Sequence, residues 1–133
     1  MIFIDSNIPM YLIGAAHPRK NDAQVIVERL IAMRERLVTD AEVLQEMLHR
    51  YTSIGRREAI FPALQTTLGL VDDVLPIDKS DVLRAGEIVR GGGPLSARDA
   101  IHIAVMERHQ ISSILSFDAD FDSWPGLRRI HRI

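Results

Sequence analysis

Short runs rich in apolar residues alternate with longer stretches of mixed polarity along the whole chain. The short runs are predicted to be strands, and they lie at 1–5, 37–39, 74–77, 114–117 and 127–130. The longer stretches carry apolar residues three and four positions apart, which predicts helices at 9–15, 23–36, 39–51, 56–70, 78–90 and 96–109. We expect His17–Arg19 to be a turn and residues 118–124 to be a turn with a short helix.

The alternation of strands with helices predicts the α/β class. Strands as apolar as Ile2–Ile4 need helices on both faces of their sheet, and helices between successive strands make those strands parallel. No repeat, low-complexity tract or long linker interrupts residues 1–133, so we expect a single domain. The sequence therefore predicts a central parallel sheet covered on both faces.

The composition excludes several kinds of chemical site but adds little to the prediction of the fold. The chain of 133 residues contains no cysteine, which excludes disulfides, thiolate zinc sites and cysteine nucleophiles. No apolar run approaches the roughly 20 residues of a membrane span, and Met1–Ile4 is too short for a signal sequence, so we expect a soluble, cytoplasmic protein. The net charge of −2 argues against a broadly basic nucleic-acid-binding surface, although arginines gather locally, as at 128–132.

Three acids lie where predicted strands end or a predicted helix begins. Asp5 closes the first apolar run, Asp118 closes the run 114–117, and Asp99 lies in the first turn of the helix that begins near Ser96. Because the carboxyl ends of parallel strands meet at one edge of a sheet, these side chains should lie close together. Clustered carboxylates repel one another unless a cation lies among them, and oxygen ligands suit Mg²⁺ or Mn²⁺. The pattern predicts a divalent-metal site.

Each acid also has a simpler interpretation. Asp5 could be only a turn or cap residue, and Asp99 fills the acidic position of a capping box that begins at Ser96. Glu46 lies off the apolar stripe of its helix, and this alone favours a solvated side chain paired with Arg50 four residues on. No single acid therefore establishes a site, and the argument depends on their combination.

Other polar residues near these acids are open to two interpretations. His102 shares a helix face with Asp99, and we favour a packed or hydrogen-bonded histidine over a metal ligand. Asp120 and Asp122 follow Asp118 closely and are either outer ligands or surface acids. The segment Thr39–Glu42 fits a second capping box, with Thr39 as the cap of the helix that follows.

Four segments carry a resemblance to a known family. They are residues 2–7 (IFIDSN), the helix from Thr39 to Glu46, residues 95–104 (LSARDAIHIA) and residues 115–121 (LSFDADF). Together they resemble the PIN domain, and specifically the VapC-type toxins of prokaryotic toxin–antitoxin pairs, along the full length of the chain. The third segment is the most specific. In this resemblance four residues fall at the metal-binding acids of the family: Asp5, Glu46, Asp99 and Asp118.

The resemblance implies a PIN-like three-layer α/β/α sandwich with a central parallel sheet. It also implies Mg²⁺- or Mn²⁺-dependent endoribonuclease activity, a homodimer, and inhibition by a small antitoxin in a heterotetramer or larger assembly. Ser6 follows one acid and Ser116 lies close before another, and either hydroxyl could hold a water at the metal. Glu42 stays an alternative to Glu46 as the ligand on the helix.

The resulting hypothesis is hydrolysis of an RNA phosphodiester by a water activated at one or two metal ions. Arg98 could contact a phosphate oxygen, although a surface role fits this residue equally well. Two alternatives stay open, namely an RNA-processing nuclease outside any toxin system and a non-catalytic binding module whose acids only cap helices. A phosphatase that forms an aspartyl-phosphate at Asp5 is disfavoured, because Asn7 stands where such sites need a second aspartate.

Overall fold

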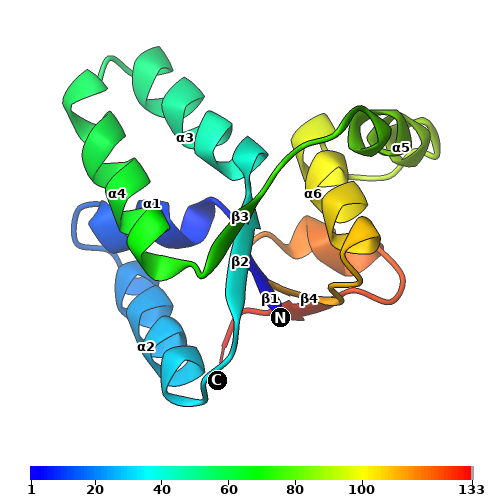
Figure 1. Cartoon of the computed structure of the whole chain (residues 1–133). Coiled ribbons are helices and arrows are strands. Elements are labelled where there is room, and N and C mark those ends of the chain that lie inside the picture. The colour runs from blue at the N-terminus through cyan, green and yellow to red at the C-terminus, as the bar shows by residue number, and fades with distance from the viewer. Residues whose placement is uncertain (133) are drawn as a thin grey trace.

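The computed structural model describes residues 1–132 and contains a parallel sheet of five strands (Figure 1). The order across the sheet is β3-β2-β1-β4-β5, which places β1 at the centre with β2 and β4 beside it. The predicted parallel sheet is therefore confirmed. In chain order the strands are β1 (Ile2–Ile4), β2 (Leu37–Asp40), β3 (Asp73–Leu75), β4 (Ser113–Leu115) and β5 (Arg128–Ile130).

Helices fill each connection between successive strands, as the alternation of patterns predicts. The α-helices are α1 (Asn7–Ile13), α2 (Pro18–Ala32), α3 (Ala41–Ser53), α4 (Ile60–Leu70), α5 (Lys79–Arg90) and α6 (Ala97–Arg108). Two short 3₁₀ helices are also present, η1 (Arg57–Ala59) and η2 (Ala119–Ser123). None of the helices within residues 1–132 combines the length and the apolar character that crossing a membrane requires.

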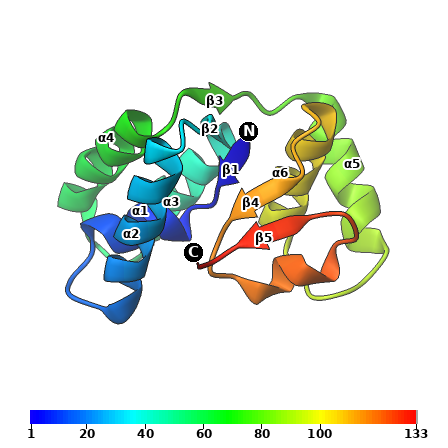
Figure 2. The same ribbon diagram turned by 90° about the horizontal axis from the view of Figure 1, so that it is seen from below.

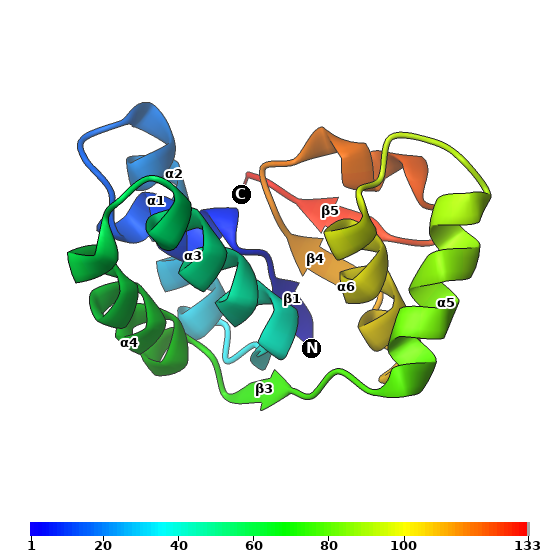
Figure 3. The same cartoon turned by 90° about the horizontal axis from the view of Figure 1, so that it is seen from above.

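Two hydrophobic cores lie on opposite faces of the sheet. Phe3 packs with buried residues of α3, α5 and α6, whereas its neighbours Ile2 and Ile4 pack with buried residues of α1 and α2. Successive side chains of a strand point to opposite faces, so the two cores are separated by the sheet. Figures 2 and 3 show the strands between α1 and α2 on one side and α5 and α6 on the other. The three-layer α/β/α arrangement is confirmed.

Hydrogen bonds beyond the regular ladder hold the carboxyl ends of the central strands together. The backbone N–H of Asp5 donates to Leu115 O at 3.1 Å, which extends the pairing of β1 with β4 by one residue. The hydroxyl of Thr39 donates to Ile4 O at 2.7 Å from the neighbouring strand β2. The residues that follow β1, β2 and β4 therefore emerge at one edge of the sheet, close to one another.

The helix α2 begins earlier and ends earlier than its apolar pattern predicts. His17 caps the helix by accepting from Arg19 N, and Pro18 occupies the first helical position, where its missing N–H is no loss. The expected turn at His17–Arg19 is therefore wrong, and so is the helix range 23–36. Val25 and Ile31 are about half exposed, which shows that the real buried face follows Ala23, Ile26, Val27 and Leu30.

The start of α3 also differs from its prediction. Thr39 is a strand residue whose side chain is fully buried, and the cap is Asp40, whose Oδ1 accepts from Val43 N at 2.9 Å. The capping box predicted at Thr39–Glu42 is wrong, because the threonine hydroxyl bonds across the sheet and Asp40, one residue later, caps the helix instead. The predicted helix at 56–70 is divided into η1 and α4. The capping box of α6, between Ser96 and Asp99, is confirmed.

Candidate active site

Asp5 lies directly after the central strand β1, at the carboxyl edge of the sheet. Only 4% of its surface is exposed, and both carboxylate oxygens accept hydrogen bonds. Oδ1 accepts from Ser6 N at 2.8 Å, and Oδ2 accepts from the Ser116 hydroxyl at 2.6 Å and from Asn7 Nδ2 at 3.2 Å. These donors come from the segments that directly follow β1 and β4, so the topology of the sheet fixes the direction of this carboxylate.

Burial of the Asp5 carboxyl has a large electrostatic consequence. It raises the pKa of this group from its usual 3.8 to about 6, an effect that the nearby His102 opposes and that the nearby Glu46 reinforces. The group is thus poorly stabilised as an anion by the protein alone. A positive charge placed beside Asp5 would correct this deficit, so the site favours a cation.

Glu46 reaches the same point from α3, and its side chain is 14% exposed. Its Oε2 accepts from the Ser6 hydroxyl at 2.6 Å, and its Oε1 accepts from His102 Nε2 at 2.7 Å. Burial alone would raise the pKa of Glu46, but the hydrogen bonds and charge of His102, with help from Ser6 and Arg98, lower it below its usual value. The ion pair with Arg50, which the helical spacing alone favours, does not form among the described residues.

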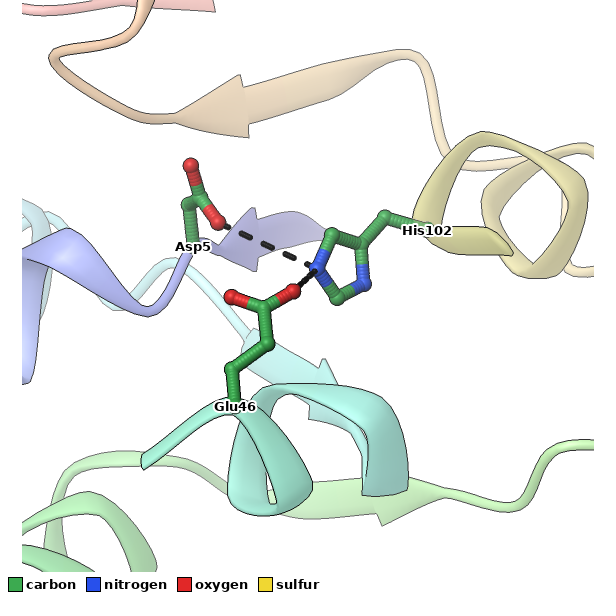
Figure 4. Close-up of side chains that lie close together, drawn as sticks. All are labelled: Asp5, Glu46 and His102. Atoms are coloured by element: carbon green, nitrogen blue, oxygen red, sulfur yellow. Dashed lines mark hydrogen bonds and ion pairs between the residues drawn. The ribbon is translucent and has the colours of Figure 1, made fainter. Parts of the chain in front are cut away.

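His102 is fully buried in α6, where it joins two acids (Figure 4). Its Nδ1 donates to Asp40 Oδ2 at 2.8 Å, and its Nε2 donates to Glu46 Oε1 at 2.7 Å and lies 4.0 Å from Asp5 Oδ1. Burial alone would lower the pKa of His102, but the charges and hydrogen bonds of Asp40 and Glu46 raise it well above its usual value. The preference for a hydrogen-bonded histidine therefore agrees with the structure.

Asp5, Glu46 and His102 converge from three different elements. One ligand atom from each lies within 4.8 Å of the other two, and within residues 1–132 no other group of three potential metal ligands is this tight. Figure 4 shows the three side chains pointing toward one another from the end of β1, from α3 and from α6. The carboxylates of Asp99 and Asp118 lie outside this group.

Asp99 and Asp118 lie near each other beside this group. The carboxylate of Asp99 accepts from Ser96 N at 3.2 Å, which closes the capping box of α6. Burial and the nearby charge of Asp118 raise the pKa of Asp99, while the bonds to Ser96 oppose the rise. Asp118 is tied to Asp5 through Ser116, whose hydroxyl accepts from Asp118 N at 3.0 Å and donates to Asp5.

The remaining acids predicted to be auxiliary lie farther out. Asp120 is exposed, and its N–H donates to Asp118 Oδ1 at 2.9 Å. The carboxylate of Asp122 is held by two bonds from Arg129, at 2.9 and 3.0 Å. Glu42 stays outside the tight group, although burial and its acidic neighbours, among them Glu46, raise its pKa. Of the two glutamates left open by the sequence, the structure brings Glu46 to Asp5.

A hollow of about 430 Å³ opens beside the acids, between α1, α3 and the start of α6. Glu46 and Ser6 form one part of its lining, and Arg50 and Arg98 form another. Among residues 1–132, neither arginine makes a side-chain hydrogen bond or ion pair with a carboxylate, although Arg98 is close enough to lower the pKa of Glu46. The hollow is completed by Asn7, Met10 and Tyr11.

Asp40 and His102 belong to the site, although the sequence pattern gives neither of them a role in it. Asp40 is the last residue of β2, and the rule that placed Asp5 and Asp118 at strand ends applies to it equally. Asp40 was not recognised as a strand-end acid, because the strand was predicted to end one residue earlier, at Thr39. His102 gave a signal as the one ionisable residue on an otherwise apolar stretch of helix, 100–106.

Sequence comparisons relate this chain to proteins of a known family. The family model described as "PIN domain" matches residues 2–127. Ribonuclease VapC13 of Mycobacterium tuberculosis is 57% identical over 130 residues, which cover 98% of this chain and 99% of that protein. Ribonuclease VapC23 of the same species is 35% identical over 118 residues, which cover 89% of this chain and 93% of that protein.

Solved structures show the same architecture. The crystal structure of Mycobacterium tuberculosis VapC20, described as a sarcin-ricin loop cleaving toxin, matches with a TM-score of 0.76 and 26% identity, over 96% of this chain and 99% of that one. VapBC2 from Rickettsia felis, bound to a DNA fragment from its promoter, matches with a TM-score of 0.76, and at 16% identity over the whole of both chains it supports the fold alone. The chain therefore belongs to the PIN domain family, and within it to the VapC ribonucleases.

Proposed function

We propose that this protein is a divalent-metal-dependent endoribonuclease that acts as the toxin of a toxin–antitoxin pair. The observation that carries the proposal is the convergence of two carboxylates at the carboxyl edge of the sheet, with Asp99 and Asp118 beside them. Asp5 is buried with a raised pKa, and a cation beside it would favour the ionised carboxylate. Oxygen donors of this kind suit Mg²⁺ or Mn²⁺.

The acids have distinct roles in this proposal. Asp5, Glu46, Asp99 and Asp118 would hold one or two ions at the end of β1. A divalent ion bound there would lower the pKa of a bound water and offset the negative charge that develops on the phosphate. Ser116 holds Asp5 in position through its 2.6 Å hydrogen bond and Ser6 holds Glu46 in the same way. One carboxylate of the set would accept the proton of the attacking water.

The hollow beside the acids offers a place for the RNA backbone. Arg98 and Arg50 line it without a carboxylate partner within residues 1–132, so their guanidinium groups are available to phosphate oxygens. Glu46 lies in the same lining, which puts the phosphate-binding groups next to the proposed metal ligands. We infer that Arg98 contacts a phosphate adjacent to the scissile one.

The partner of the protein is proposed from its relatives. Its sequence relatives are VapC ribonucleases, and several solved structures with the same fold are VapBC assemblies, such as VapBC-1 from nontypeable Haemophilus influenzae. We propose that a small antitoxin covers the hollow, that the ribonuclease is a homodimer, and that the complex is a heterotetramer or larger. A short reading frame for a DNA-binding protein directly upstream of the gene would support this part of the proposal.

Cleavage of RNA tests the proposed activity. Purified protein and the Asp5→Asn variant are incubated with total cellular RNA in the presence of Mg²⁺, Mn²⁺ or EDTA. We expect discrete fragments with the native protein and either metal, and intact RNA with EDTA or with the variant. Intact RNA under all conditions, or fragments that persist with Asp5→Asn, would contradict the proposal.

A further inference from the structure

Asp40 and His102 are buried polar residues that the four-acid site does not require. Both are fully inaccessible to solvent, so neither can touch an RNA strand. Burying a histidine and a carboxylate costs free energy unless each is fully hydrogen-bonded, and here the bonds lead from one residue to the next and end at Glu46. The direction of this chain of bonds points to a role at the acid site.

The chain of bonds begins at a rigid point of the backbone. Asp40 is the N-cap of α3, and its Oδ1 is fixed by Val43 N at 2.9 Å. Its other oxygen, Oδ2, accepts from His102 Nδ1 at 2.8 Å, so the ring is anchored through one nitrogen. The ring of Phe3 lies against the imidazole with 5.2 Å between centroids, which limits rotation of the ring.

This series of hydrogen bonds ends at Glu46, the side chain with the most conformational freedom in the site. Glu46 has three rotatable bonds, and it comes from a helix outside the sheet, whereas Asp5 directly follows a strand. His102 Nε2 holds its Oε1 at 2.7 Å, and the Ser6 hydroxyl holds its Oε2 at 2.6 Å. Both oxygens are therefore fixed, and the carboxylate points toward Asp5 (Figure 4).

Without these donors Glu46 would have another partner available. Arg50 follows it by one helical turn and lines the same hollow. Glutamate and arginine at this spacing attract each other, by roughly 0.2–0.5 kcal/mol on an exposed helix. If Glu46 turned toward Arg50, its carboxylate would move away from Asp5. The two donors, His102 and Ser6, therefore keep Glu46 in place as a possible metal ligand and prevent a surface ion pair with Arg50.

We propose that His102, anchored by Asp40, is a positioning residue that holds Glu46 toward Asp5 for binding of the divalent cation. The inference rests on the proposed function, because it concerns a ligand of the same site. Residues that orient a metal ligand without touching the metal typically contribute about 10- to 100-fold in metal affinity. His102 acts through Glu46 and is not itself a ligand.

Two conservative variants separate the two bonds of the imidazole. In His102→Gln the amide nitrogen takes the place of Nε2, which keeps the bond to Glu46 and loses the bond to Asp40. In His102→Asn the amide nitrogen takes the place of Nδ1, which keeps Asp40 and frees Glu46. The measurement is the dissociation constant for Mn²⁺ by titration calorimetry, together with thermal unfolding in EDTA.

We expect His102→Asn to weaken Mn²⁺ binding by about 10- to 100-fold and His102→Gln to weaken it only a few-fold. Both variants remove one bond of a buried ring, so a purely structural role predicts similar melting temperatures and similar Mn²⁺ affinities for the two. Equal affinities of the two variants would therefore overturn the inference.

A double-mutant cycle shows whether His102 acts through Glu46. In a Glu46→Gln background, His102→Asn should change the Mn²⁺ affinity less than about twofold, because the residue that it positions is no longer a ligand. A loss as large as in the native background would overturn the inference. If the native protein itself binds no Mn²⁺, the proposed function fails, and not only the role of His102.

A measurement on the native protein covers the case in which His102→Asn does not fold. Nitrogen-15 NMR of the His102 ring is recorded in EDTA and with saturating Mg²⁺. We expect Nε2 to keep its proton when Mg²⁺ binds, since it goes on donating to Glu46. Loss of that proton would show that the ring binds the metal directly, and it would overturn the positioning role.

Discussion

The Asp5 carboxyl group is buried among donors that do not fully stabilise its charge. Ser6, Asn7 and Ser116 donate to it, and His102 lies 4.0 Å away, yet its pKa is still raised to about 6. A residue in this state favours either a proton or a cation. In the metal-free protein, the free energy of unfolding should therefore depend on pH through the protonation of Asp5.

The first prediction concerns the stability of Asp5→Asn without metal. The folded-state pKa of about 6 exceeds the usual 3.8, so native protein holds this proton more tightly than unfolded protein does. Stability from Asp5 is therefore lost as the pH rises from about 4 to 6. Asparagine removes this loss, and Asp5→Asn should be more stable than native protein at pH 7.5, by at most about 3 kcal/mol.

Urea unfolding in EDTA checks this prediction at two values of pH. The advantage of Asp5→Asn should be largest at pH 7.5 and should shrink at pH 4.5, where Asp5 is protonated in the native protein. A variant that is less stable than the native protein at pH 7.5 would show that ionised Asp5 is stabilised by the fold, contrary to this description of the site.

The second prediction compares the two glutamates of α3. Glu46→Gln removes a carboxylate held at the acid group, whereas Glu42→Gln changes a side chain outside it. Cleavage by Glu46→Gln should fall by more than the roughly 10- to 100-fold that loss of an outer-shell partner causes. Glu42→Gln is the matched control and should stay within about tenfold of native activity. The reverse order, measured by single-turnover cleavage, would assign the ligand to Glu42.

At the scale of elements, the site is made by the ends of strands and the starts of helices. Asp5 follows β1, Asp40 ends β2 and caps α3, and Asp99 lies in the first turn of α6. Each of these acids also accepts a hydrogen bond from a nearby backbone N–H and so stabilises the local backbone conformation. The capping interpretation and the metal interpretation of Asp99 are compatible, because the cap fixes the direction of the carboxylate.

The third prediction uses this double role in α6. Ser96→Ala removes the hydroxyl that accepts from Asp99 N, and it should lower the free energy of unfolding by about 1 kcal/mol. Because the first turn of the helix also holds Asp99, a proposed metal ligand, loosening of this turn should lower the Mn²⁺ affinity several-fold. Asp78→Ala is the control, since it changes the N-cap of α5 and removes an ion pair with Arg108, away from the acids. It should lower stability similarly and leave Mn²⁺ affinity unchanged, and a loss of affinity in both variants would contradict the argument.

The sequence was sufficient to predict elements whose apolar pattern matches their burial. All five strands and the capping box at Ser96 were predicted. The central strand β1 is wholly apolar and buried, whereas β5 carries two arginines and is only partly buried. The helix α2 was misplaced because Val25, Ile31 and Met33 are apolar but exposed, and they shift the apparent stripe. Spacing alone put Glu46 on the surface, since its partners Ser6 and His102 are 40 and 56 residues away in sequence. Contacts of that range depend on the fold and not on local pattern.

On the scale of the whole molecule, a cation at the acid group would join the two halves of the sandwich. Asp5 directly follows the central strand, Glu46 belongs to α3 and Asp99 belongs to α6, so one ion would connect elements that are far apart in the chain. A ligand that binds only the native state stabilises it in proportion to its saturation. Metal binding should therefore be visible in global unfolding.

The fourth prediction is this stabilisation. Mn²⁺ at 100 times its dissociation constant should raise the free energy of unfolding by about 2.7 kcal/mol, and EDTA should reverse the effect. The measurement is urea unfolding with and without Mn²⁺. Asp5→Asn should show no such gain, because it lacks the buried carboxylate. An equal gain in the variant would place the ion elsewhere in the protein.

The most direct test of a metal-dependent nuclease centre compares metal occupancy with RNA cleavage in one titration. Chelated protein receives increasing Mn²⁺, and the bound fraction and the rate of cleavage of one RNA fragment are measured at each step. If the acids at the end of β1 form a metal-dependent nuclease centre, the rate rises from zero and follows occupancy with the same midpoint. Full cleavage by the chelated protein, or full occupancy without cleavage, would contradict that claim.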